Sequence, residues 1–205
     1  MLALVLRVAL ALELATYVAI AVGRFDAEPT LALLAALGAL LGLRAGIAAV
    51  TWTFAWVYQS PAPRLGVLGA LRMALADYAA FVFTFAVLLP FEGLWLGSDR
   101  LRPTPDRPPL LLIHGYGCSR GVWWWLRRRL EAAGWVVATL NLEPIYTDIE
   151  HYVDSVARRI DEVCHATGSE QVILVAHSMG GLVARAYLRR RGAARVAKLD
   201  RKSVV

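Results

Sequence analysis

Ser178 is the side chain whose surroundings most clearly suggest chemistry, because small residues lie two positions before it and two positions after it. The segment reads Ala176, His177, Ser178, Met179 and Gly180. A serine on a very sharp turn needs such neighbours, since larger side chains would collide across the bend. A hydroxyl at the start of a helix also lies near free backbone N–H groups and the positive end of the helix dipole. The pattern therefore predicts a serine nucleophile that attacks a carbonyl group.

A parallel sheet with helices on both faces is the arrangement that the flanking pattern predicts. Short apolar runs of the kind found in strands buried on both faces alternate with stretches of helical periodicity. The predicted strands are Leu110 to Ile113, Trp135 to Leu140 and Gln171 to Ala176, and the predicted helices are Gly121 to Ala133, Asp148 to Ala166 and Met179 to Arg191. Gly168 is the expected stop of the second helix. Alternating strands and helices indicate an α/β fold, in which Ser178 follows the third strand directly.

These motifs resemble those of the α/β-hydrolase superfamily, and particularly those of bacterial triacylglycerol lipases and esterases. The segments that carry the resemblance are "LLLIHGYG", "GWVVATLNL" and "VILVAHSMGGLVARAYL". The resemblance covers about Pro108 to Leu199. Ala176 stands where the usual pattern has glycine, a form that a subset of bacterial lipases shares.

The resemblance implies how the site works. The loop His114, Gly115, Tyr116 and Gly117 follows the first strand, where lipases place an oxyanion donor. The backbone N–H groups of Tyr116 and Met179 would then hold the oxyanion of the tetrahedral intermediate, and His114 would be structural. The implied substrates are carboxylic esters, including lipids.

The acid and histidine of the family's triad do not follow Ser178 here. The family order is serine, then aspartate or glutamate, then histidine, whereas Asp200 is the only carboxylate after Ser178 and no histidine follows it. We expect this chain by itself to be catalytically impaired. Either the reading frame is truncated, or a partner supplies the missing residues. The alternative interpretation is a catalytically inactive, membrane-associated interaction protein.

Residues 1–97 are expected to form a membrane anchor. Hydrophobic residues make up 58% of the chain and the mean hydropathy is +0.52, which exceeds the usual content of soluble domains. Three apolar stretches are long enough to cross a bilayer, which takes about 20 helical residues. They run from Leu2 to Val22, from Leu31 to Tyr58 and from Leu68 to Leu96, with the second break at Gln59 through Arg64. Arg44 could pair with Glu13 or Asp77 between helices.

Residues 98–108 read as an exposed linker rich in Arg, Asp and Pro, and residues 109–205 as the partial hydrolase domain. The net charge of +6 lies in the second half, where residues 98–205 carry 17 Lys and Arg against 11 Asp and Glu. We expect membrane lipids and an ester or lipid substrate as partners, and no nucleic acid, because the arginine clusters lack interleaved aromatic residues.

We expect no metal and no cofactor, since the two cysteines form no CxxC motif and neither GxGxxG nor GxxxxGK[ST] is present. The expected location is a bacterial-type inner membrane. A small excess of arginines on the side of the hydrolase domain favours a cytoplasmic domain.

Overall fold

The computed structural model describes residues 1–58, 65–104 and 106–202. The chain divides into two compact units, one of Met1–Leu4 with Leu88–Val205 and one of Val5–Val87. The predicted break at Gln59 through Arg64 lies outside the described residues.

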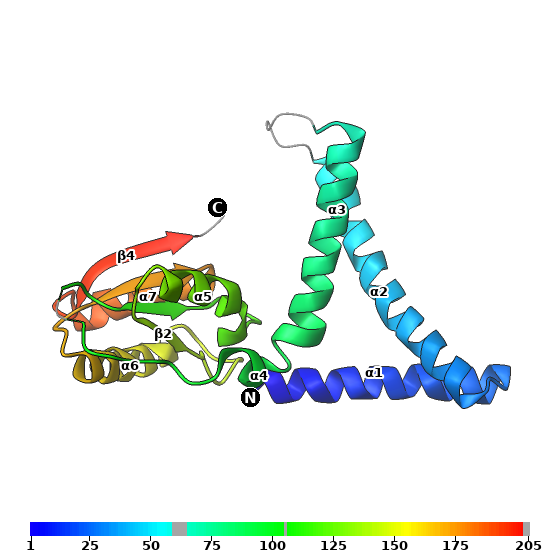
Figure 1. Ribbon diagram of the computed structural model, residues 1–205, viewed down its shortest axis with the longest axis horizontal. Helices are drawn as coiled ribbons and strands as arrows, with labels where there is room; N and C mark the ends of the chain where they lie inside the picture. The colour runs from blue at the N-terminus through cyan, green and yellow to red at the C-terminus, as the bar shows by residue number, and fades with distance from the viewer. Residues whose placement is uncertain (59–64, 105, 203–205) are drawn as a thin grey trace. The chain divides into compact units, whose positions relative to one another are not determined.

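A parallel sheet of four strands forms the centre of the larger unit (Figure 1). Its order is β2 (Val137–Leu140), β1 (Leu110–Ile113), β3 (Val172–His177) and β4 (Val196–Lys202), and every neighbouring pair is parallel. All four residues of β1 are buried, as expected for a strand with neighbours on both sides and helices on both faces. The predicted parallel α/β sheet is confirmed.

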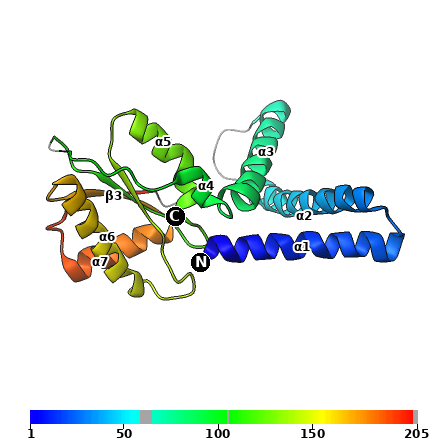
Figure 2. The ribbon, with the colours of Figure 1, turned by 60° about the horizontal axis from the view of Figure 1, so that its bottom comes forward.

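Helices cover both faces of this sheet (Figure 2). One face carries the short helix η2 (Arg120–Trp123) and α5 (Trp124–Ala132), which pack with Leu110, Leu112 and Val137. The other carries α6 (His151–Thr167) and α7 (Met179–Arg191), which pack with Leu111 and Ile113. The alternation of side chains along β1 therefore divides the core into two layers. The predicted helix from Met179 to Arg191 matches α7 at both ends.

Helix α6 shows why the sequence forms these elements where it does. Its buried residues recur at intervals of three and four, from Tyr152 through Val156 and Ile160 to Val163, which is the spacing of one helix face. Gly168 follows the helix in the left-handed conformation, with φ of 68°, a conformation that favours glycine and ends many helices. The predicted stop at Gly168 is confirmed.

Asp99 fastens the segment before β1 to the sheet. Its carboxylate is 3% exposed and accepts hydrogen bonds from the amide of Thr139 at 2.6 Å, from Arg127 at 2.9 Å and from Arg159 at 2.6 Å. Because β2 is an edge strand, the amide of Thr139 has no strand partner, and Asp99 satisfies it. The segment 98–108, predicted as an exposed linker, thus contributes a buried carboxylate to the domain; residue 105 lies outside the described residues.

The smaller unit consists of long apolar helices. Helices α1 (Leu2–Phe25), α2 (Pro29–Val57) and α3 (Val67–Val82), the last continued by the π-helix η1 (Phe83–Leu88), are each long and apolar enough to cross a membrane. The third stretch was expected to run to Leu96. It ends at Leu88 because Pro90 lacks a backbone N–H and its ring obstructs a continuing helix. The chain resumes as the separate short helix α4 (Glu92–Leu96), which belongs to the larger unit.

An ion pair joins α1 and α2. Both terminal nitrogens of Arg44 donate to the two carboxylate oxygens of Glu13 at 2.8 Å. Asp77, the other partner considered for Arg44, instead accepts a hydrogen bond from Trp52 at 3.2 Å. Paired charges of this kind are the form in which ionisable groups are tolerated in apolar surroundings.

Candidate active site

Ser178 occupies a strained backbone conformation between β3 and α7. Its φ is 52° and its ψ is −125°, a region that residues with a side chain seldom adopt and that costs about 1 to 3 kcal/mol. Such strain persists only where the surrounding structure enforces it. The side chain itself is exposed, whereas Ala176, two residues earlier, is 1% exposed. The bend therefore presents a serine hydroxyl to solvent at the carboxyl end of the sheet.

The absence of a side chain at Gly180 allows the bend to form. A Cβ atom at Gly180 would lie 2.5 Å from the carbonyl oxygens of both Ile113 and His114, far inside ordinary contact. The first turn of α7 is thus packed directly on the backbone at the end of β1. This contact is the physical reason why the residue two positions after Ser178 must be small.

The loop after β1 lies against Ser178 in the same way. A Cβ atom at Gly115 would lie 3.0 Å from Cβ of Ser178 and 3.2 Å from Nδ1 of His177. Tyr116 follows with its side chain 65% exposed, and Gly117 has φ of 65°. Among the described residues, the amides of Tyr116 and Met179 donate no backbone hydrogen bond of the turns, loops and caps. Tyr116 and Met179 follow Gly115 and Ser178 directly, so their amides lie next to residues that contact one another.

His114 holds this loop and is not free for catalysis. The ring is 2% exposed, its Nδ1 lies 2.8 Å from the carbonyl oxygen of Gly115, and its Nε2 accepts a hydrogen bond from the amide of Leu142 at 3.1 Å. A carbonyl only accepts and an amide only donates, so the ring is neutral with its proton on Nδ1. Burial lowers the pKa of His114, which favours the same neutral form.

Asn141 fastens the other end of the loop, a role that the sequence interpretation missed. Its Oδ1 accepts from the amide of Arg120 at 2.6 Å, and its Nδ2 donates to Glu92 at 3.0 Å. Asn141 follows β2 directly, and the carboxyl ends of parallel strands share one edge of the sheet. A polar residue at that position was the available signal.

The remaining histidines lie on α6 or beside Ser178. His151 and His165 are exposed residues of α6, and His177 is exposed beside Ser178. Asp200 lies in β4 opposite Val175. Over residues 1–58, 65–104 and 106–202, no group of three or more His, Cys, Asp or Glu side chains is arranged to hold a metal ion.

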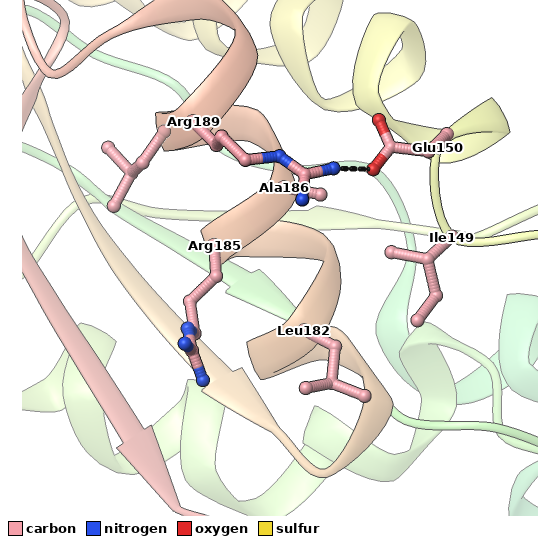
Figure 3. A pocket seen from close by; sticks show the side chains of 7 residues that line it. Ile149, Glu150, Leu182, Arg185, Ala186 and Arg189 are labelled. Carbon is pink, nitrogen blue, oxygen red and sulfur yellow. Dashed lines mark hydrogen bonds and ion pairs between the residues drawn. The ribbon is translucent and has the colours of Figure 1, made fainter.

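A surface groove of about 580 Å³ lies between α7 and the two residues that precede α6, beginning one helical turn after Ser178 (Figure 3). Leu182 and Ile149 give it an apolar part, and an ion pair between Arg189 and Glu150 crosses it. Arg185 lies beside Leu182 on α7. The groove combines apolar and charged walls next to the serine-bearing helix.

A comparison with protein-family models agrees with this architecture. The family model described as alpha/beta hydrolase fold matches residues 108–199. Similar solved structures include the mature form of the Bacillus licheniformis lipase BlEst2, with 24% identity, 48% of this chain and 41% of that chain covered, and a TM-score of 0.44. Another is a membrane phospholipase A described as a bacterial virulence factor, with 21% identity. This match covers 68% of this chain and 52% of that chain and has a TM-score of 0.37.

The chain thus spans 41% and 52% of the length of these two proteins. A search of curated proteins gave no match. The matched segment contains β1, β2, β3 and the bend at Ser178. Residues 108–199 therefore show the α/β hydrolase fold.

Proposed function

We propose that this chain carries the nucleophile and oxyanion-binding half of a serine hydrolase of the lipase and esterase type, which acts on carboxylic esters. The observation that carries the proposal is the strained, exposed backbone of Ser178, with φ of 52°, enclosed by close contacts at Gly115 and Gly180. A fold does not specify a function by itself. A strained, exposed serine between a strand and a helix of a parallel sheet, however, is the geometry of the nucleophile elbow of α/β-hydrolases.

In the proposed reaction, Oγ of Ser178 forms a bond to the carbonyl carbon of the ester while a base takes its proton. The carbonyl oxygen becomes an oxyanion, which accepts hydrogen bonds from the amides of Tyr116 and Met179. Each such donor contributes roughly 2.7 to 4 kcal/mol to transition-state stabilisation. Collapse of the intermediate releases the alcohol, which takes the proton, and water then hydrolyses the acyl-serine.

The base of this reaction is not found at the family's position in residues 1–205. The family's histidine follows its nucleophile in the chain, and here all four histidines precede Ser178. His114 is committed to the loop by hydrogen bonds at both ring nitrogens. We infer that these residues alone react slowly, with the residual rate that an oxyanion hole sustains without a base.

A fluorophosphonate probe tests the nucleophile. The full chain in detergent should be labelled slowly, Ser178→Ala should not be labelled, and Ser155→Ala should be labelled as wild type, because Ser155 lies on α6 and contacts Arg158. Labelling that persists in Ser178→Ala would refute the proposal. Folded wild type that is never labelled would instead favour the inactive membrane-associated interaction protein.

Added imidazole tests the missing base separately. If Ser178 lacks only a base, imidazole should accelerate labelling of wild type and leave Ser178→Ala unlabelled. Fast labelling that imidazole does not change would mean that a base already lies within these residues, and the inference of impairment would be wrong.

Lipid-like esters near a membrane are the substrates that this proposal favours. The reason is that three helices long and apolar enough to cross a bilayer precede the domain in the same chain. We propose a bacterial-type inner membrane as the location, with the domain on the cytoplasmic side. A cysteine-accessibility assay on intact cells checks the side: reagents that do not cross the membrane should fail to modify Ser155→Cys.

A further inference from the structure

Two rows of tryptophan and arginine lie along the outer side of α5. Trp124 and Arg128 are four residues apart, as are Trp125 and Arg129, and residues at this spacing are neighbours on a helix surface. The guanidinium of Arg128 lies 5.5 Å from the ring centre of Trp124, and that of Arg129 lies 4.6 Å from that of Trp125. Trp125 is 58% exposed. The opposite side of the helix packs on the sheet through Leu126 and Leu130.

Helix α4 extends this surface. The rings of Trp95 and Trp124 meet edge to face, with their centres 6.2 Å apart. Trp95, Arg100, Trp124 and Arg128 are among the residues that line a groove of about 290 Å³, together with Leu96, Arg127 and Glu131. We call Trp95, Arg100, Trp124, Trp125, Arg128 and Arg129 the Trp–Arg face.

Among the described residues, the arginines of this face lack carboxylate partners. Within residues 1–58, 65–104 and 106–202, no ion pair involves Arg100, Arg128 or Arg129. The nearby Glu131 is engaged by Arg127 at 2.7 Å. Two arginines at the end of α7, in contrast, form ion pairs with α6, from Arg189 to Glu150 and from Arg191 to Asp154 at 2.8 Å. The Trp–Arg face therefore carries positive charge without a carboxylate partner beside the exposed rings of Trp95 and Trp125.

The chain leads to this face directly from a candidate membrane span. The third apolar helix ends at Leu88, and α4 begins at Glu92. Four residues reach at most roughly 14 Å, so a span that ends at Leu88 keeps the start of α4 in or close to the headgroup region of the bilayer. Tryptophan is enriched in that region, and arginine there is attracted to anionic lipid.

We propose that the Trp–Arg face binds an anionic phospholipid surface, with the indole rings at the level of the headgroups and Arg100, Arg128 and Arg129 against lipid phosphates. The two interactions are compatible because a guanidinium stacked on an indole retains its outward N–H donors. This contact is independent of the reaction at Ser178. It gives the domain a second attachment to the membrane, in addition to the spans.

Fluorine NMR of the full chain, labelled with 5-fluorotryptophan and reconstituted in nanodiscs, tests the contact. The discs contain phosphatidylcholine alone or with phosphatidylglycerol, and a nitroxide-headgroup phosphatidylcholine serves as the relaxation agent. In the anionic discs, the Trp125 signal should relax much faster than the signal of Trp123, which is on the buried side of the helix and 9% exposed. In the discs of phosphatidylcholine alone, this difference should be absent.

Charge variants complete the test. Arg128→Gln with Arg129→Gln should lower the ratio of bound to unbound domain about 25-fold, since each basic residue near such a surface contributes roughly fivefold. Arg185→Gln with Arg190→Gln, two exposed arginines of α7, should leave the relaxation unchanged. Equal relaxation of Trp125 in both kinds of disc would overturn the proposal. Loss of the fast relaxation in the Arg185→Gln, Arg190→Gln variant as well as in the Arg128→Gln, Arg129→Gln variant would also overturn it. Broadening that depends on protein concentration and not on lipid charge would indicate a second copy of the chain instead.

Discussion

The substitution Gly180→Ala should disrupt the bend at Ser178 through a single added methyl group. That methyl would lie 2.5 Å from the carbonyl oxygens of Ile113 and His114, whereas ordinary contact begins near 3.4 Å. The start of α7 must therefore move by roughly 0.9 Å, because both opposing atoms belong to the backbone of the sheet and its loop. Overpacking of this kind costs about 1 to 3 kcal/mol.

The same movement displaces Ser178 from the loop that carries Tyr116. A misplacement of about 1 Å reduces rates by roughly 100-fold, so fluorophosphonate labelling should fall by about that factor. Chemical unfolding of the full chain in detergent, followed by tryptophan fluorescence, measures the stability. Gly93→Ala is the matched control, since Gly93 is also helical but nothing lies within 4 Å of its added Cβ. If Gly180→Ala matched Gly93→Ala in stability and labelling, the close packing of α7 on β1 would be refuted.

Three further predictions concern ionisable groups. Asp99→Asn should lower the free energy of unfolding by about 3 to 5 kcal/mol, because Arg127, 5% exposed, loses its buried counter-charge; an unchanged unfolding midpoint would contradict this. Glu13→Gln and Arg44→Gln should each weaken helix packing in detergent more than the double substitution does, and a double-mutant cycle with no coupling would exclude the ion pair. Burial lowers the pKa of His114 in the folded chain, so stability should fall as the pH drops below about 6.5, where the unfolded histidine takes up a proton. His114→Gln should lose that part of the pH dependence.

The sheet and the serine bend were predictable because their signals are local. The apolar run at Leu110–Ile113, the small residues around Ser178 and the helical spacing of α6 each lie within a few residues of the feature they specify. The structure matches these elements closely. The roles of Tyr116 and Met179 stay predictions, since they depend on the reaction itself.

Other features depend on partners distant in sequence and were not predictable in this way. Asp99 lies in a segment whose composition is typical of an exposed linker, and its burial follows from Arg127, Thr139 and Arg159, which are 28 to 60 residues away. The end of the third apolar helix at Leu88 had a local signal in Pro90. The hydropathy of the following residues outweighed that signal in the interpretation of the sequence.

The structure of the full chain after reaction with a phosphonate ester is the most direct measurement of the proposed chemistry. We predict a covalent bond from phosphorus to Oγ of Ser178. The phosphoryl oxygen should lie about 2.7 to 3.1 Å from the amide nitrogens of both Tyr116 and Met179, as expected for an oxyanion hole. A phosphoryl oxygen that points to solvent, or an adduct on another residue, would contradict the assignment of this site.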